Sequence, residues 1–132
     1  MSKTYDKYFV VDTNIILEDF TNIAKLSDEG HNLIILPEIV LDEIDSKKSG
    51  FEEINYQARK FARFLEDSQI KESKEIDEHK IISLEVDNIH LTIISKETYK
   101  TDSKQISLSI SNDRKILEIA VFANEYYEKD IE

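Results

Sequence analysis

The sequence contains no cysteine, only two glycines and one proline, and no long apolar run. Without cysteine there are no disulfides and no thiolate metal sites, so any metal ion must be held by oxygen or imidazole. Two glycines cannot build a Gly-rich phosphate loop of the Walker or dinucleotide-binding type. No run can cross a bilayer, and the opening MSKTYDKYF lacks the hydrophobic stretch of a secretory signal. We therefore expect a cytoplasmic protein with no membrane association.

The charge balance is strongly acidic. The 132 residues fit a single domain that buries a core, with 40% hydrophobic and 34% charged residues. Against 17 lysines and arginines stand 28 aspartates and glutamates, which gives a formal net charge of -11. Such a chain does not hold nucleic acid by overall charge alone. A small basic patch stays compatible with the sequence.

Hydrophobic spacing in the first half predicts alternating strands and helices. Short apolar runs without alternation are typical of strands covered on both faces, as in parallel sheets. Apolar residues at helical spacing predict helices, and Gly30 and Gly50 stand where two of them would end. The predicted elements are a strand at residues 8–11, a helix at 15–26, a strand at 32–37, a helix at 38–50 and a longer helix at 51–65. This order favours an α/β fold with a central parallel sheet flanked by helices.

The second half adds two extended segments and a final helix. The charged sequence KESKEIDEHK, residues 71–80, is predicted to be a turn-like separator. Residues 81–86 and 90–95 are predicted to be strands joined by a turn at Asp87 and Asn88, one in the core and the other at an edge. Residues 111–129 have the spacing of an amphipathic helix.

Three carboxylates stand out by their position. Asp12 ends the first predicted strand, at the edge of an open α/β sheet where ligands bind. Glu43 lies in the helix after the second strand, and Asp113 at the start of the last helix. Carboxylates that converge on one pocket repel one another unless a divalent cation neutralises them, and oxygen ligands favour Mg²⁺ or Mn²⁺. If the three converge, the sequence predicts a metal site.

Each of these acids also has a simpler interpretation. Asp12 fits a helix N-cap, Glu43 a solvated helix residue, and Asp113 a charge that complements the helix dipole. The three histidines show no ligand spacing, and we expect ordinary surface or edge positions for them. Spacing alone leaves both interpretations of the acids open.

Three motifs carry a family resemblance. They are VVDTNIIL at residues 10–17, ILPEIVLDEID at 35–45 and SNDRKILEIA at 111–120. In this order they resemble the successive acidic motifs of the PIN-domain nucleases, most closely the PIN domain that precedes PhoH-type ATPase modules. The resemblance implies a three-layer PIN-like domain over residues 1–132 and a metal-dependent endoribonuclease.

The resemblance also implies roles for particular residues. The catalytic and metal-binding acids of the family match Asp12, Glu43 and Asp113, and its supporting polar pair matches Thr13 and Asn14. One or two Mg²⁺ or Mn²⁺ ions would activate a water for attack on an RNA phosphodiester and stabilise the leaving oxygen.

One feature of the family has no match in this sequence. After the last helix the family continues with a parallel strand and a further acidic motif, whereas this chain ends at Glu132. Asp102 and Asp130 are weak substitutes for that acid. We therefore expect a domain truncated at its C-terminus whose first strand has an open edge. A second copy in a homo-oligomer, or further residues of a longer protein with a C-terminal ATPase domain, would complete it.

Two arginines are candidates for substrate binding. Arg59 and Arg63 lie one helical turn apart, with Lys60 beside them, and we predict that they receive RNA phosphates. That they are solvated charges on an acidic surface is an equally open interpretation.

Two other functions remain open at this stage. The missing fourth acid is compatible with a catalytically weak or silent PIN-like module that binds RNA or a protein. The other alternative is a toxin-type PIN ribonuclease paired with an antitoxin.

Overall fold

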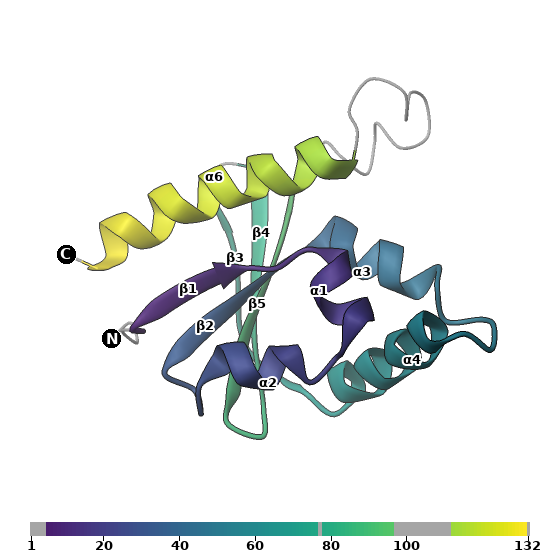
Figure 1. Ribbon diagram of the computed structural model, residues 1–132. Helices are drawn as coiled ribbons and strands as arrows, with labels where there is room; N and C mark the ends of the chain where they lie inside the picture. Colours follow the sequence, from purple (N-terminus) through teal and green to yellow (C-terminus); the bar gives the residue numbers. More distant parts are fainter. Residues whose placement is uncertain (1–4, 77, 97–111, 132) are drawn as a thin grey trace.

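The structure is a computed structural model that describes residues 5–76, 78–96 and 112–131 (Figure 1). Side chains within the last helix are described for residues 114–127. The elements are β1 (Lys7–Val10), α1 (Thr13–Glu18), α2 (Asn22–Ser27), β2 (Asn32–Pro37), α3 (Glu38–Asp45), α4 (Glu53–Glu66), β3 (Gln69–Ile76), β4 (His79–Val86), β5 (Ile89–Lys96) and α6 (Asn112–Ile131).

The strands form one five-stranded sheet in the order β1-β2-β5-β4-β3. β1 pairs with β2 and β2 with β5 in parallel, whereas β5 with β4 and β4 with β3 are antiparallel. The predicted central parallel sheet is therefore confirmed for β1, β2 and β5, and a hairpin and a further strand extend it. Within the described residues β1 pairs on one side only, so it has the open edge that we expected.

The core divides into two layers on opposite faces of β2. Ile34 and Leu36 belong to the cluster covered by α1 to α4, and Leu33 and Ile35 to the cluster covered by α6. Figure 1 shows the same arrangement, with α6 on one face of the sheet and the earlier helices on the other. All six residues of β2 are buried, as expected for a strand covered on both faces. The predicted three-layer α/β fold is confirmed.

The prediction of one helix over residues 15–26 is wrong. The chain forms two short helices, α1 and α2, separated around Asp19. Asp19 has extended backbone angles, and its Oδ1 accepts hydrogen bonds from the Thr21 backbone N–H (3.0 Å) and hydroxyl (2.7 Å). These hydrogen bonds lower the pKa of Asp19. A local side-chain turn thus replaces the helical hydrogen bonds that the apolar spacing predicts.

The charged segment at residues 71–80 is not a turn-like separator. Its first part belongs to β3, which pairs antiparallel with β4 and forms an edge of the sheet. Most of β3 is exposed, and its register shifts between Ile70 and Glu72. Charged side chains and a bulge are common on edge strands because they oppose pairing with other chains. Neither β4 nor β5 is an edge strand, which corrects the expectation that one of them would be.

The tight turn between β4 and β5 is confirmed. Asp87 and Asn88 have φ values of 47° and 67°, and they are the two residues between the strands. Positive φ at both positions is the geometry of a type I′ hairpin turn, which Asp and Asn tolerate better than most residues. α3 ends at Asp45 and not near Gly50 as predicted, so a loop separates it from α4.

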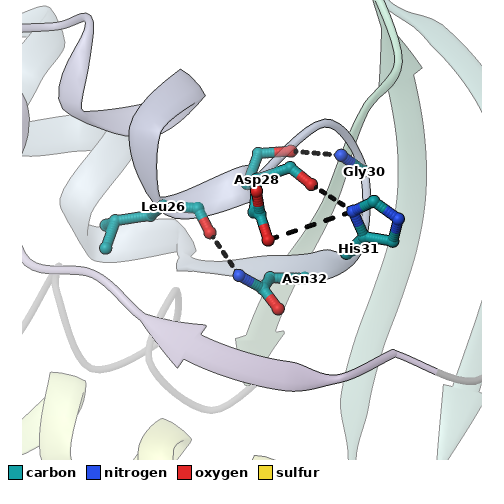
Figure 2. A network of polar contacts seen from close by, with 6 residues as sticks. Leu26, Asp28, Gly30, His31 and Asn32 are labelled. Carbon is teal, nitrogen blue, oxygen red and sulfur yellow. Dashed lines mark hydrogen bonds and ion pairs between the residues drawn. The ribbon is translucent and has the colours of Figure 1, made fainter.

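A network of polar contacts fixes the connection from α2 to β2 (Figure 2). The Asn32 side-chain amide donates to the Leu26 carbonyl at 2.8 Å. His31 Nδ1 lies 2.7 Å from the Asp28 carbonyl oxygen and 3.9 Å from its Oδ2. Gly30 directly precedes His31 and has a φ of 89°, a left-handed backbone angle that glycine adopts more readily than other residues.

Replacing Gly30 by alanine should destabilise the fold. A Cβ at this position would lie 2.6 Å from the Asn88 carbonyl oxygen and 3.3 Å from His90 Cδ2. With the strain of a positive φ added, we expect Gly30→Ala to lower the free energy of unfolding by about 2 kcal/mol, measured by urea denaturation. The neighbouring Glu29→Gly also changes a residue with positive φ, but it relieves strain and should be neutral or slightly stabilising. Equal stability of Gly30→Ala and the parent chain would contradict this account.

Candidate functional site

Asp12 lies directly after β1 and caps α1. Its backbone is extended, with φ -100° and ψ 176°, and its Oδ1 accepts a hydrogen bond from the Ile15 backbone N–H at 3.2 Å. The preceding Val11 N–H donates to the Ile35 carbonyl at 3.1 Å, which holds this segment against β2. The capping interpretation is therefore correct for Asp12. It leaves room for metal binding, because an ionised carboxylate offers about four lone-pair positions.

Thr13 connects the first two acidic motifs. The Thr13 hydroxyl donates a hydrogen bond to Glu43 Oε1, 30 residues away in the chain. Both side chains are half-buried, whereas Asp12 is exposed. The bond joins the first residue of α1 to α3, and it orients the glutamate carboxylate. The structure thus brings Glu43 to the helix that Asp12 caps.

The other predicted site residues are placed less completely. Asn14 is exposed on α1, and its supporting role stays a prediction. Asp113 is the second residue of α6, and its side chain lies outside the described residues. α6 contacts α3, and Figure 1 shows the start of α6 near α3. The weak substitutes are also outside: Asp102 is not described, and only the backbone of Asp130 is.

The described carboxylates have the chemistry of a hard-cation site, but they do not complete one. Asp12 and Glu43 offer oxygen ligands only, the set that Mg²⁺ and Mn²⁺ prefer. Each carboxylate accepts a hydrogen bond from α1, as the ligands of metal sites commonly do from neighbouring groups. Among the residues whose side chains are described, no three His, Cys, Asp or Glu lie close enough together to hold a metal ion.

The two candidate arginines have different surroundings. Arg59 is half-buried, and its Nη1 donates to the carbonyl oxygens of Lys48 (2.7 Å) and Gly50 (2.9 Å). This guanidinium thus fastens the loop between α3 and α4. Arg63 is exposed in the last turn of α4. Substrate binding stays a prediction for both, and Arg59 also has a structural role.

Sequence reasoning missed that Lys115 is buried. Lys115 is only 7% exposed, and the composition of an acidic protein does not predict a buried lysine. Helical spacing could have indicated its burial, because Lys115 precedes the buried Ile119 and Ala123 by four and eight residues and so lies on the same face of the helix. A lysine side chain therefore lies inside the fold two residues after Asp113.

A mixed sheet with helices on both faces, and acids beyond β1 and on α3, is consistent with a PIN-like α/β fold. Residues 9–131 match the family described as the PIN domain, and the chain belongs to that family. The match confirms the resemblance carried by the three acidic motifs. Members of the family are generally nucleases.

The chain is also similar in sequence to a longer bacterial protein. Protein PhoH2 of Bacillus subtilis (strain 168) is 25% identical over 114 residues. The aligned segment is 86% of this chain and 24% of PhoH2, so the chain spans about a quarter of the length of that relative. No solved structure matches the chain. In the described part of the chain, no helix is both long enough and apolar enough to cross a membrane.

Removing the Thr13 hydroxyl should weaken the contact between α1 and α3. Thr13→Val keeps the shape of the side chain but leaves Glu43 without this donor, and we expect a loss of about 1 kcal/mol in unfolding free energy, measured by urea denaturation. Thr13→Ser keeps the hydroxyl and is the matched control. A Val variant as stable as the Ser variant would show that the bond contributes nothing.

The two arginines should differ in their effect on stability. Arg59→Gln loses the hydrogen bonds to two carbonyl oxygens and should lower the unfolding free energy by about 1 to 2 kcal/mol. Arg63→Gln removes the same charge from an exposed position and should stay within about 0.5 kcal/mol of the parent chain. Thermal unfolding of both variants in one buffer makes the comparison, and equal melting temperatures would contradict the structural role of Arg59.

Proposed function

We propose that this domain is a Mg²⁺- or Mn²⁺-dependent endoribonuclease. The observation that carries the proposal is the hydrogen bond from Thr13 to Glu43, which joins the first two acidic motifs of a PIN-domain chain. Parallel pairing of β1 with β2 brings both segments to one edge of the sheet, and the bond holds the Glu43 carboxylate at the residue that follows Asp12. The two acids are proposed to form one acidic region beyond the carboxyl end of β1, where ligands bind in open α/β sheets.

Each residue of the proposed site has a separate task. Asp12 and Glu43 bind the cation, with Asp113 as the third acid that the family motif implies. The bound cation supplies Lewis-acid stabilisation of the phosphodiester and an activated water. Thr13 holds the Glu43 carboxylate in one orientation, and the α1 N–H of Ile15 does the same for Asp12. Both ligands are thereby ordered before the substrate arrives, which reduces the entropy lost on binding.

The substrate is proposed to be RNA, held mainly by local contacts. A net charge of -11 opposes long-range attraction of a polyanion, and a cation held by Asp12 and Glu43 would reduce that repulsion locally. Arg59 and Arg63 on α4 are proposed to bind RNA phosphates. The similarity to PhoH2 supports the further proposal that the domain works beside an ATPase module.

RNA cleavage by the parent chain and two isosteric variants tests the proposal. A fluorescent single-stranded RNA should be cut internally with Mn²⁺ or Mg²⁺ present and left intact with EDTA. Asp12→Asn and Glu43→Gln keep the side-chain shapes but remove ligand charges, so we expect at least about a hundredfold slower cleavage. Binding of Mn²⁺ alone, measured by calorimetry, should weaken in both variants.

The control for these variants is Glu18→Gln. Glu18 is an exposed acid at the other end of α1, and its replacement should leave cleavage and Mn²⁺ binding unchanged. Cleavage that persists in EDTA, or in the Asp12 and Glu43 variants, would reject the proposed site. Mn²⁺ binding without any RNA cleavage would instead identify a silent PIN-like module.

A further inference from the structure

The face of the sheet that α6 covers is apolar at one end and polar at the other. Ile81 on β4 lies opposite Ile94 on β5, and both pack in the cluster that contains Ile119 of α6. The next two pairs along the same face are Ser83 with Thr92, and Glu85 with His90. Positions beneath a helix are normally apolar, because burying polar groups costs free energy. This end of the face is therefore polar, although Thr92 within it is buried.

A cavity lies over these polar pairs. It has a volume of about 610 Å³, and Ser83, Glu85, His90 and Thr92 line it. This volume is within the range of small-molecule sites, roughly 300 to 1,000 Å³. The cavity is distant from the acidic site along the strands. Asp12 follows the carboxyl end of β1, whereas His90 is near the amino end of β5, which runs in the same direction.

Tyrosine rings form a fixed wall of the cavity. Tyr127 stacks on Tyr8, with ring centres 4.9 Å apart, and makes a hydrogen bond with Thr92. Burial raises the pKa of Tyr127, so its phenol stays neutral. Tyr126 meets Tyr127 edge to face at 4.8 Å and lines the cavity beside it. Tyr8 and Thr92 thus hold Tyr127 in place, and Tyr127 in turn contacts Tyr126, so the aromatic wall has a fixed position.

Charged groups lie around the cavity in a definite order. Lys71 and Lys74 of β3 line one side, and Lys74 Nζ lies 5.2 Å from the centre of the Tyr126 ring. Glu72 lines the same side between the two lysines, and its Oε1 lies 3.8 Å from Lys74 Nζ. Glu85 also lines the cavity. The pKa of Tyr5, another lining residue, is raised mainly by burial and further by the nearby Tyr8 and Glu85. Ammonium groups and carboxylates thus both line the cavity.

The position of His90 is supported from behind. Its ring meets Tyr5 at 5.6 Å with the planes 60° apart. On the other side Gly30 approaches so closely that an added Cβ would lie 3.3 Å from His90 Cδ2. The contacts in Figure 2 hold the turn that carries Gly30. His90 of β5 is therefore held between the segment that carries Tyr5 and the turn that carries Gly30.

We propose that this cavity binds a free guanine mononucleotide, with the base against the wall of Tyr126 and Tyr127, its N–H edge at Glu85 and the phosphate at Lys71 and Lys74. An aromatic wall suits a base, because bases stack on tyrosine rings. The guanine edge presents two adjacent N–H donors that match the two oxygens of a carboxylate. Adenine and cytosine present one donor beside an acceptor nitrogen, which the carboxylate repels. Lysine is a common phosphate ligand.

Titration with GMP tests the site directly. Backbone NMR signals of the full 132-residue chain, without metal, should shift at cavity residues such as Ser83 and Thr92 on addition of GMP. UMP and inorganic phosphate should each bind at least tenfold more weakly, because neither offers the guanine edge. An absence of shifts at millimolar GMP, or equal binding of phosphate alone, would overturn the proposal.

Variants separate the base contact from the phosphate contact. Glu85→Gln should weaken GMP binding about tenfold and leave UMP binding unchanged, whereas Glu75→Gln is the control. Glu75 is exposed on β3, next to Lys74 and on the opposite face of the strand. Lys71 is exposed on the edge strand β3. Lys71→Gln should weaken the binding of GMP but not the binding of guanosine, which has no phosphate. Unchanged GMP affinity in both cavity variants would reject these contacts.

The acidic site needs its own control. Asp12→Asn should bind GMP with unchanged affinity, so a failure of the nuclease proposal and a failure of the cavity proposal can be told apart. GMP shifts confined to residues around Asp12 and Glu43 would overturn the cavity assignment. Preference for an RNA tetramer with an internal guanosine over GMP would also overturn it, because the proposed ligand is a single nucleotide.

Discussion

Burial of β2 on both faces is the constraint on which the rest of the structure depends. All six of its residues are buried, and Leu33 to Leu36 alternate between the two core clusters. Each such side chain contributes roughly 1.5 to 3 kcal/mol only when it leaves water, so the strand needs a layer on each side. α6 supplies one layer and the earlier helices supply the other (Figure 1). Three-layer architecture follows from the apolarity of one strand.

The same constraint positions the acidic site. Parallel pairing of β1 with β2 brings their carboxyl ends to one edge, and the hydrogen bond from Val11 to Ile35 extends that pairing to the residue before Asp12. Helix α3 begins directly after β2, so Glu43 lies at the same edge. Thr13 then joins the two segments. The site is thus a consequence of strand direction, with one side-chain bond that orients it.

The cavity lies where the pairing of the sheet changes from parallel to antiparallel, at β5. The hairpin from β4 to β5 and the edge strand β3 extend the sheet beyond β2. There the face toward α6 changes from Ile81 and Ile94 to polar pairs, and a cavity lies over them. Leu33 and Ile81 of the apolar cluster under α6 line the same cavity. The sheet therefore has acids beyond one end of its parallel strands and a polar cavity toward the other end.

The sequence by itself determined the elements whose signals are local. The apolar run at residues 32–37 and the amphipathic last helix are read correctly because burial imposes periodicity on neighbouring residues. It also supplied the order of the acidic motifs. The helix break at Asp19 and the strand nature of residues 69–76 were missed, since the first depends on one side-chain turn and the second on pairing with β4. Only the tertiary structure decided that Thr13 meets Glu43, because a contact across 30 residues arises from the packing of α1 on α3 and leaves no periodic trace in the sequence.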